Sequence, residues 1–162
     1  MRTLGVDPGT ATTGFAIVEE NCKSLKLIDY GCIKTSKAID MPDRLRIISE
    51  KLEAIIEKYN PNNIAVEDLF FCNNAKTAIK VGQARGVILL VAALAKLKVF
   101  EYTPLQVKMA LTGYGKADKK QVQYMVKKIL GCKDVPKQDD ASDAIAIAIC
   151  HLNSHKMKEF NK

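Results

Sequence analysis

The order of hydrophobic periodicities along the chain constrains its fold more than any other feature. Apolar residues alternate with small or polar ones over three stretches between residues 4 and 33, a pattern typical of strands. From residue 42 the apolar spacing becomes helical, and short apolar runs at 63–67 and 98–102 then alternate with helical segments. This order predicts one α/β domain with a mixed five-stranded sheet, three antiparallel strands followed by two parallel ones, flanked by helices.

The helical segments are expected at 42–59, 74–97, 104–111 and 119–130, where apolar residues recur every three to four positions. The segment 139–152 is ambiguous, because Ile145, Ile147 and Ile149 alternate as in a strand. Its acidic beginning and its four alanines favour a helix that packs closely on the sheet.

Composition narrows the class of protein. With 162 residues, 48% of them hydrophobic and 27% charged, the chain is expected to bury a core without disulfides or a structural metal. The five cysteines form no C-x-x-C pair, which indicates free thiols in a reducing cytoplasm. Only two histidines are present, both near the C-terminal end, so a Cys–His enzyme is disfavoured. The longest apolar run, 87–95, is about half a membrane span, so we expect a cytoplasmic protein with no membrane partner.

The charge balance indicates an anionic partner. The chain has 25 Lys and Arg against 18 Asp and Glu, a net charge of +7, and nucleic acid is the leading candidate. Most of the excess lies in one segment, because residues 116–137 hold seven Lys and two Asp.

Carboxylates follow the strands in a pattern that suggests a metal site. Asp7 ends the first strand and Glu67 the fourth, and these strands are expected to be sheet neighbours; Asp140 and Asp143 share one face of the last helix. Two like charges at ~4 Å repel by about 4 kcal/mol at an effective dielectric of 20, so such acids converge only around cations. Oxygen-only ligands select Mg²⁺ or Mn²⁺, and two such ions can hydrolyse a phosphodiester. Three of these acids also have a purely structural interpretation: Asp7 as a turn residue, Glu67 as a solvated strand end and Asp140 as a helix cap.

Four blocks resemble the RuvC family of Holliday-junction resolvases, whose fold is RNase H-like. They are LGVDPGTATTGFAIV at 4–18, IAVEDLFFCNNAKTAIKVGQARG at 64–86, FEYTPLQVKMALTGYGKADKKQVQYMV at 100–126 and DDASDAIAIAICH at 139–151. The resemblance implies a homodimeric endonuclease of homologous recombination and DNA repair, with two Mg²⁺ per active site and Mn²⁺ as a substitute. It would resolve four-way DNA junctions by paired symmetric nicks that leave 5′-phosphate and 3′-hydroxyl ends. It also suggests the RuvA–RuvB branch-migration complex as a partner.

The resemblance also assigns residues by position. The metal-binding catalytic acids would be Asp7, Glu67, Asp140 and Asp143, and Lys108 and Lys119 would be catalytic basic residues. The residues expected to bind DNA are Phe70, Lys80, Arg85, Lys108, Lys116, Lys119 and Lys120. Asp139 could also reach an ion, Asp68 should point to the opposite side of its strand, and Phe71 either stacks on DNA or is core.

The resemblance suggests that part of the helix at 74–97 forms the dimer interface, and a two-fold dimer suits the symmetry of a junction. We expect a single nuclease domain over 1–155 and a short basic tail over 156–162.

Three other functions are weighed against this one. Another RNase H-like nuclease that acts on structured RNA would share the opening DPGT but should lack the GQARG helix. A nucleotide-binding protein of the actin or sugar-kinase kind needs a second Asp-x-Gly loop, which the sequence lacks. A non-catalytic binding module would use the lysines and aromatic residues without metal.

Overall fold

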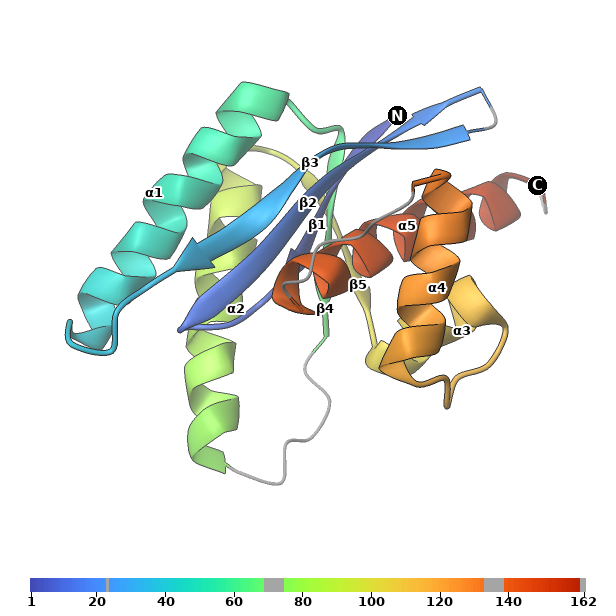
Figure 1. Cartoon of the computed structure of the whole chain (residues 1–162). Coiled ribbons are helices and arrows are strands. Elements are labelled where there is room, and N and C mark those ends of the chain that lie inside the picture. Colours follow the sequence, from blue (N-terminus) through green and yellow to red (C-terminus); the bar gives the residue numbers. More distant parts are fainter. Residues whose placement is uncertain (23, 69–74, 133–138, 161–162) are drawn as a thin grey trace.

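The computed structural model describes residues 1–22, 24–68, 75–132 and 139–160, with only the backbone considered at 75–76 and 155–160. Within these ranges the chain forms five strands and five helices (Figure 1). The strands are β1 (Arg2–Asp7), β2 (Thr12–Asn21), β3 (Ser24–Lys34), β4 (Asn63–Glu67) and β5 (Lys98–Tyr102). The helices are α1 (Met41–Tyr59), α2 (Ala75–Leu94), α3 (Pro104–Thr112), α4 (Lys119–Leu130) and α5 (Asp139–Phe160).

The strands form one mixed sheet in the order β3-β2-β1-β4-β5. The first three strands are antiparallel neighbours, whereas β4 runs parallel to β1 and β5 runs parallel to β4. The predicted fold class is therefore confirmed, and so is the expectation that the first and fourth strands lie side by side.

Helices cover both faces of the sheet (Figure 1). On one face, Leu4 and Val6 of β1 pack in a core with Ile48 of α1 and Ile88 of α2. On the other face, α5 supplies more residues of the second core than any other element, and α3 and α4 pack beside it. Because side chains alternate along a strand, Gly5 and Asp7 of β1 face α5.

Two glycines let α5 lie directly on the sheet. A Cβ at Gly5 would lie 2.2 Å from the carbonyl oxygen of Ala144, and one at Gly14 would lie 2.0 Å from that of Asp140. Any side chain at these positions would push the helix away. Since Gly14 pairs with Asp7 across β1 and β2, this contact brings the beginning of α5 to the end of β1.

The helix ends follow local signals. Asn60 ends α1 in the left-handed conformation with φ 42°, next to Pro61, as predicted. The helix α2 ends at Leu94, three residues earlier than expected, because Lys96 adopts φ 56°. The ambiguous segment from Asp139 is a helix, as predicted, and it extends to Phe160.

Candidate active site

The four predicted acids, Asp7, Glu67, Asp140 and Asp143, converge and are called the acidic cluster below. In the β1–β4 register Val6 pairs with Val66, so Asp7 and Glu67 are the next residues on adjacent parallel strands. Both lie on the α5 side of the sheet, where the first two turns of α5 carry the other two acids. The parallel pairing and the glycine contact on β2 together explain why residues so distant in sequence meet.

The cluster concentrates negative charge in a half-buried position. Burial and the charges of the three other acids raise the pKa of Asp7 from 3.8 to about 8. Burial, followed by the charge of Asp143, raises the pKa of Glu67, while Lys108 acts in the opposite direction. Burial also raises the pKa of Asp143, although Lys119 opposes it. The carboxyl groups of Asp7, Glu67 and Asp143 are therefore harder to ionise than in water, which is expected where like charges meet with little solvent.

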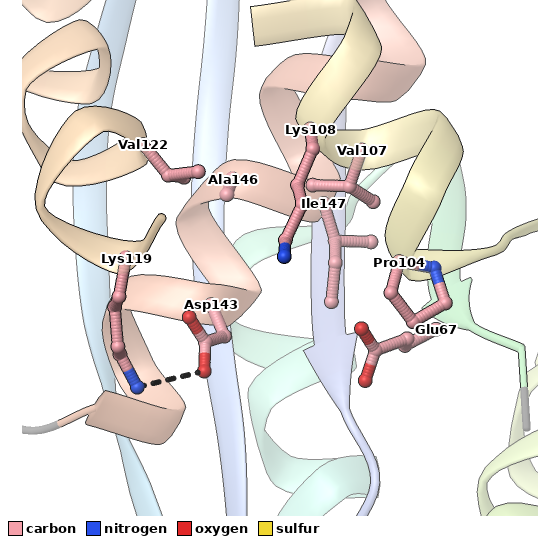
Figure 2. A pocket seen from close by; sticks show the side chains of 9 residues that line it. All are labelled: Glu67, Pro104, Val107, Lys108, Lys119, Val122, Asp143, Ala146 and Ile147. Atoms are coloured by element: carbon pink, nitrogen blue, oxygen red, sulfur yellow. Dashed lines mark hydrogen bonds and ion pairs between the residues drawn. The ribbon is translucent and has the colours of Figure 1, made fainter. Parts of the chain in front are cut away.

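Two lysines, Lys108 and Lys119, border the cluster. The Nζ of Lys119 lies 3.3 Å from a carboxylate oxygen of Asp143 and 3.3 Å from one of Asp139. Although partial burial acts in the opposite direction, these two acids raise the pKa of Lys119. Lys108 extends from α3 toward the space between Asp143 and Glu67 (Figure 2). A pocket of about 230 Å³ is lined by both lysines and by two of the acids, Glu67 and Asp143.

Position in a capped helix explains why Lys119 reaches the site. Asp118 is the N-cap of α4, and its carboxylate accepts a hydrogen bond from the backbone N–H of Gln121. Lys119 is therefore the first residue of the helix and points toward α5. The pattern Asp-x-x-Gln is a sequence signal for this cap, but the double contact of Lys119 with Asp139 and Asp143 had not been predicted.

The donor chemistry of the cluster fits hard divalent cations. Its oxygen donors are carboxylates, without His or Cys. Burial and the neighbouring acids raise the pKa values of Asp7 and Glu67, and a bound cation would offset this cost of ionisation. Among the described residues, no three His, Cys, Asp or Glu side chains are already arranged as a coordination group. Lys119 holds Asp143 in an ion pair instead. The cluster therefore has the composition of a Mg²⁺ or Mn²⁺ site whose carboxylates would have to close around the ion.

A second ion-pair group lies on the opposite face of the sheet. Asp68 accepts a hydrogen bond from Arg85 of α2 at 3.2 Å, so it points away from the acidic cluster, as expected. Arg85 also pairs with Glu101 of β5, and its side chain is 20% exposed. The structure thus places Arg85 between Asp68 and Glu101 rather than beside the acidic cluster.

The remaining predicted DNA contacts are dispersed. Lys80 is exposed on α2. Lys116 is exposed before the beginning of α4, and Lys120 is exposed in its first turn. Phe70 and Phe71 lie outside the described residues.

Taken together, the strand order, the acids at the ends of two adjacent parallel strands and the acids on the last helix define the RNase H-like class of fold and site. A family profile for the crossover junction endodeoxyribonuclease RuvC matches residues 3–151. The RuvC of Halothermothrix orenii is 55% identical over 97% of this chain and 95% of its own length. The RuvC of Syntrophomonas wolfei is 52% identical over 99% of this chain and 93% of its own.

Solved structures agree with this assignment. The structure of Thermus thermophilus RuvC in complex with a Holliday junction substrate superposes with a TM-score of 0.93 and 34% identity, covering 98% of this chain and 96% of that one. The yeast mitochondrial resolvase Ydc2 shares the fold at 15% identity, with a TM-score of 0.69 over 98% of this chain and 82% of that one. The chain belongs to the RuvC family of crossover junction endodeoxyribonucleases.

The raised pKa of Asp7 predicts that Asp7→Asn stabilises the metal-free protein, increasingly so at higher pH. The folded state holds a proton on Asp7 up to about pH 8, whereas the unfolded state releases it near pH 3.8, so the acid costs stability as the pH rises between these values. At 1.36 kcal/mol per pH unit, we expect a gain of roughly 1.6 kcal/mol near pH 5 and of roughly 5 kcal/mol near pH 8. Urea denaturation in EDTA at the two pH values measures this difference, and a gain that does not grow with pH would contradict it.

Proposed function

We propose that this protein resolves four-way DNA junctions by paired symmetric nicks that leave 5′-phosphate and 3′-hydroxyl ends, in homologous recombination and DNA repair. The observation that carries the proposal is the acidic cluster flanked by Lys108 and Lys119, in a chain that belongs to the RuvC family. The Holliday junction substrate of the Thermus relative supports the same class of DNA.

In this proposal the acidic cluster holds two Mg²⁺ ions, with Mn²⁺ as a substitute. When bound, such ions supply an activated water and stabilise the leaving oxygen. Lys108 extends into the pocket from α3, where its ammonium group can pair with the phosphate being cut. Lys119 pairs with Asp143, which lines the pocket, and with Asp139, which we propose as a further ligand.

Further DNA contacts are proposed around this pocket. They are Phe70, Lys80, Arg85, Lys116 and Lys120, together with Lys108 and Lys119. Lys116 and Lys120 are supported by their exposure next to the catalytic lysine. For Arg85 a phosphate would have to displace one of its two carboxylate partners.

We further propose a homodimer formed through α2. Ile79, Leu90 and Leu94 are 64%, 59% and 71% exposed on this helix, whereas Ile88 and Val91 are buried against the sheet. The segment Thr77–Leu94 is long and apolar enough to cross a membrane by length and composition. A second copy explains the exposed stripe better, because the other side of the same helix belongs to the protein core, and a two-fold dimer matches a two-fold junction.

Substitution of Leu90 by Glu is expected to convert the dimer to a monomer, because a charge in the centre of an apolar interface would be buried without a partner. The matched control is Leu105→Glu on α3, since Leu105 is also 59% exposed but lies off α2. Light scattering after size-exclusion chromatography gives the molar mass of each variant. If Leu90→Glu remained dimeric, the interface would lie elsewhere.

The domain and partner assignments complete the proposal. Residues 1–155 would form a single nuclease domain and 156–162 a short basic tail, in a cytoplasmic protein that works with the RuvA–RuvB branch-migration complex and has no membrane partner. This complex is suggested by the family alone.

One comparison of substrates tests the proposed function against the nearest alternative, an RNase H-like nuclease for structured RNA. A synthetic four-way junction, a linear duplex of the same sequence and a folded RNA are incubated separately with the protein and Mg²⁺. We expect paired nicks in the junction at least about 100-fold faster than cleavage of the other two substrates, a discrimination of roughly 3 kcal/mol. Faster cleavage of the RNA would favour the alternative.

A further inference from the structure

A second groove lies next to the active site, on the surface of α4 and of the segment that leads into it. Its volume is about 540 Å³, and its lining includes Tyr114, Tyr124, Lys120 and Met125. The two tyrosines are 56% and 59% exposed. Two large aromatic side chains that share an open groove are typical of a binding surface rather than of a core.

Hydrogen bonds and helical structure fix the backbone at both tyrosines. The N–H of Tyr114 donates to the Thr112 hydroxyl at 3.1 Å, and its carbonyl accepts from the same hydroxyl at 3.0 Å and from the Ala117 N–H at 3.0 Å. Tyr124 lies within α4, and the Nζ of Lys128 lies 5.5 Å from the centre of its ring. A ligand that contacts these rings would therefore order little of the protein on binding, since a tyrosine has only two side-chain torsions to fix.

The charges around the groove indicate the class of ligand. Lys120 lines it, Lys116 precedes it in the connecting segment, and Lys128 contacts the ring of Tyr124. Asp118, the one carboxylate among the described residues that line the groove, already accepts the hydrogen bond that caps α4. Exposed aromatic rings among lysines are the combination that binds single-stranded nucleic acid, with bases stacked on the rings and phosphates paired with the lysines. An apolar protein partner would have no use for these positive charges.

The position of the groove relates it to the cleavage site. Lys119 and Lys120 are consecutive residues in the first turn of α4, and the first borders the acidic cluster while the second lines the groove. A DNA strand whose phosphate lies at the acidic cluster can thus continue into the groove within a few nucleotides.

We propose that this groove binds an unpaired nucleotide of the strand that flanks the cleaved phosphodiester, with its base against Tyr114 and Tyr124 and its phosphate on Lys120. The proposal rests on the proposed function, because it takes the cleaved substrate to be DNA. It adds a base contact to a region where the sequence predicts only contacts with phosphate, and it makes unpaired DNA part of what the protein recognises.

Binding of a short single-stranded oligonucleotide that contains 2-aminopurine tests the groove directly, because stacking quenches the fluorescence of this base. We expect Tyr114→Ala and Tyr124→Ala each to weaken binding by about 5- to 100-fold and to remove the quenching, at an unchanged salt dependence. Lys120→Gln should instead lower the salt slope by about one unit. Tyr124→Phe should bind and quench like wild type, which separates loss of stacking from loss of the hydroxyl.

The control is Tyr30→Ala on β3, since Tyr30 is 46% exposed but does not line the groove. If Tyr114→Ala and Tyr124→Ala, with wild-type thermal midpoints, bound and quenched like this control, the groove would not be a nucleotide site and the proposal would be overturned. That result would be distinct from failure of the proposed function, in which the wild-type protein leaves a four-way junction uncut whatever the groove binds.

Discussion

Replacing Asp7 by Asn or Glu67 by Gln is expected to slow junction cleavage by about 10³-fold or more. Each change removes one negative oxygen ligand from the acidic cluster, and a loss of roughly 4 kcal/mol of transition-state stabilisation gives a rate effect of this size. Affinity for the junction in EDTA should be retained or improved, because the cluster repels the DNA backbone when no cation is bound. Single-turnover cleavage and fluorescence anisotropy measure the two effects separately.

The matched control for these variants is Asp68→Asn. Asp68 follows Glu67 directly, but it pairs with Arg85 on the opposite face of the sheet. This variant should cleave within about 10-fold of wild type, since its carboxylate does not contact the reacting phosphate. Wild-type cleavage by Asp7→Asn, or an equal loss in Asp68→Asn, would show that the catalytic acids have been misassigned.

Binding of the junction should depend steeply on salt, and Lys116 and Lys120 should account for part of that dependence. With about six phosphate contacts, affinity is expected to fall about 10³-fold between 50 and 200 mM salt. The double variant Lys116→Gln/Lys120→Gln should lose only about 10²-fold over the same range, because it releases about two fewer counterions. Filter binding at four salt concentrations gives the slopes.

A double variant with the same charge change provides the control. Lys51 and Lys58 lie on α1, which covers the opposite face of the sheet from α4 (Figure 1). Lys51→Gln/Lys58→Gln should keep the wild-type slope. If both double variants lowered the slope equally, the DNA-facing surface would not be centred on α4.

The sequence was sufficient to predict the sheet and the acids, because both depend on regular patterns. The alternating stretches and the later helical spacing predicted the strand order, and the parallel neighbours β1 and β4 then had to bring Asp7 and Glu67 together. The helical face shared by Asp140 and Asp143 followed from their spacing of three residues. Predicting these features requires only the local hydrophobic periodicity and the rule that strands joined through a helix run parallel in a sheet.

Other parts of the site depend on contacts that no local pattern specifies. The pairing of Arg85 with Glu101 joins α2 to β5, and which acid a half-buried arginine meets depends on how the two elements pack. The contact between Lys119 and Asp139 likewise depends on the angle between α4 and α5. The groove beside Tyr114 and Tyr124 forms only after α4 has packed, although the same tyrosines are visible in the sequence.

The rate of junction cleavage during a Mg²⁺ titration tests the central claim most directly, namely that the acidic cluster is a metal-dependent nuclease site for junctions. Protein freed of metal with EDTA is mixed with a four-way junction, and the nicked strands are followed with their end groups determined. We predict no cleavage without Mg²⁺, a rate that rises with Mg²⁺ until it saturates, and symmetric nicks with 5′-phosphate ends. Cleavage that continued at the same rate in EDTA would contradict the account.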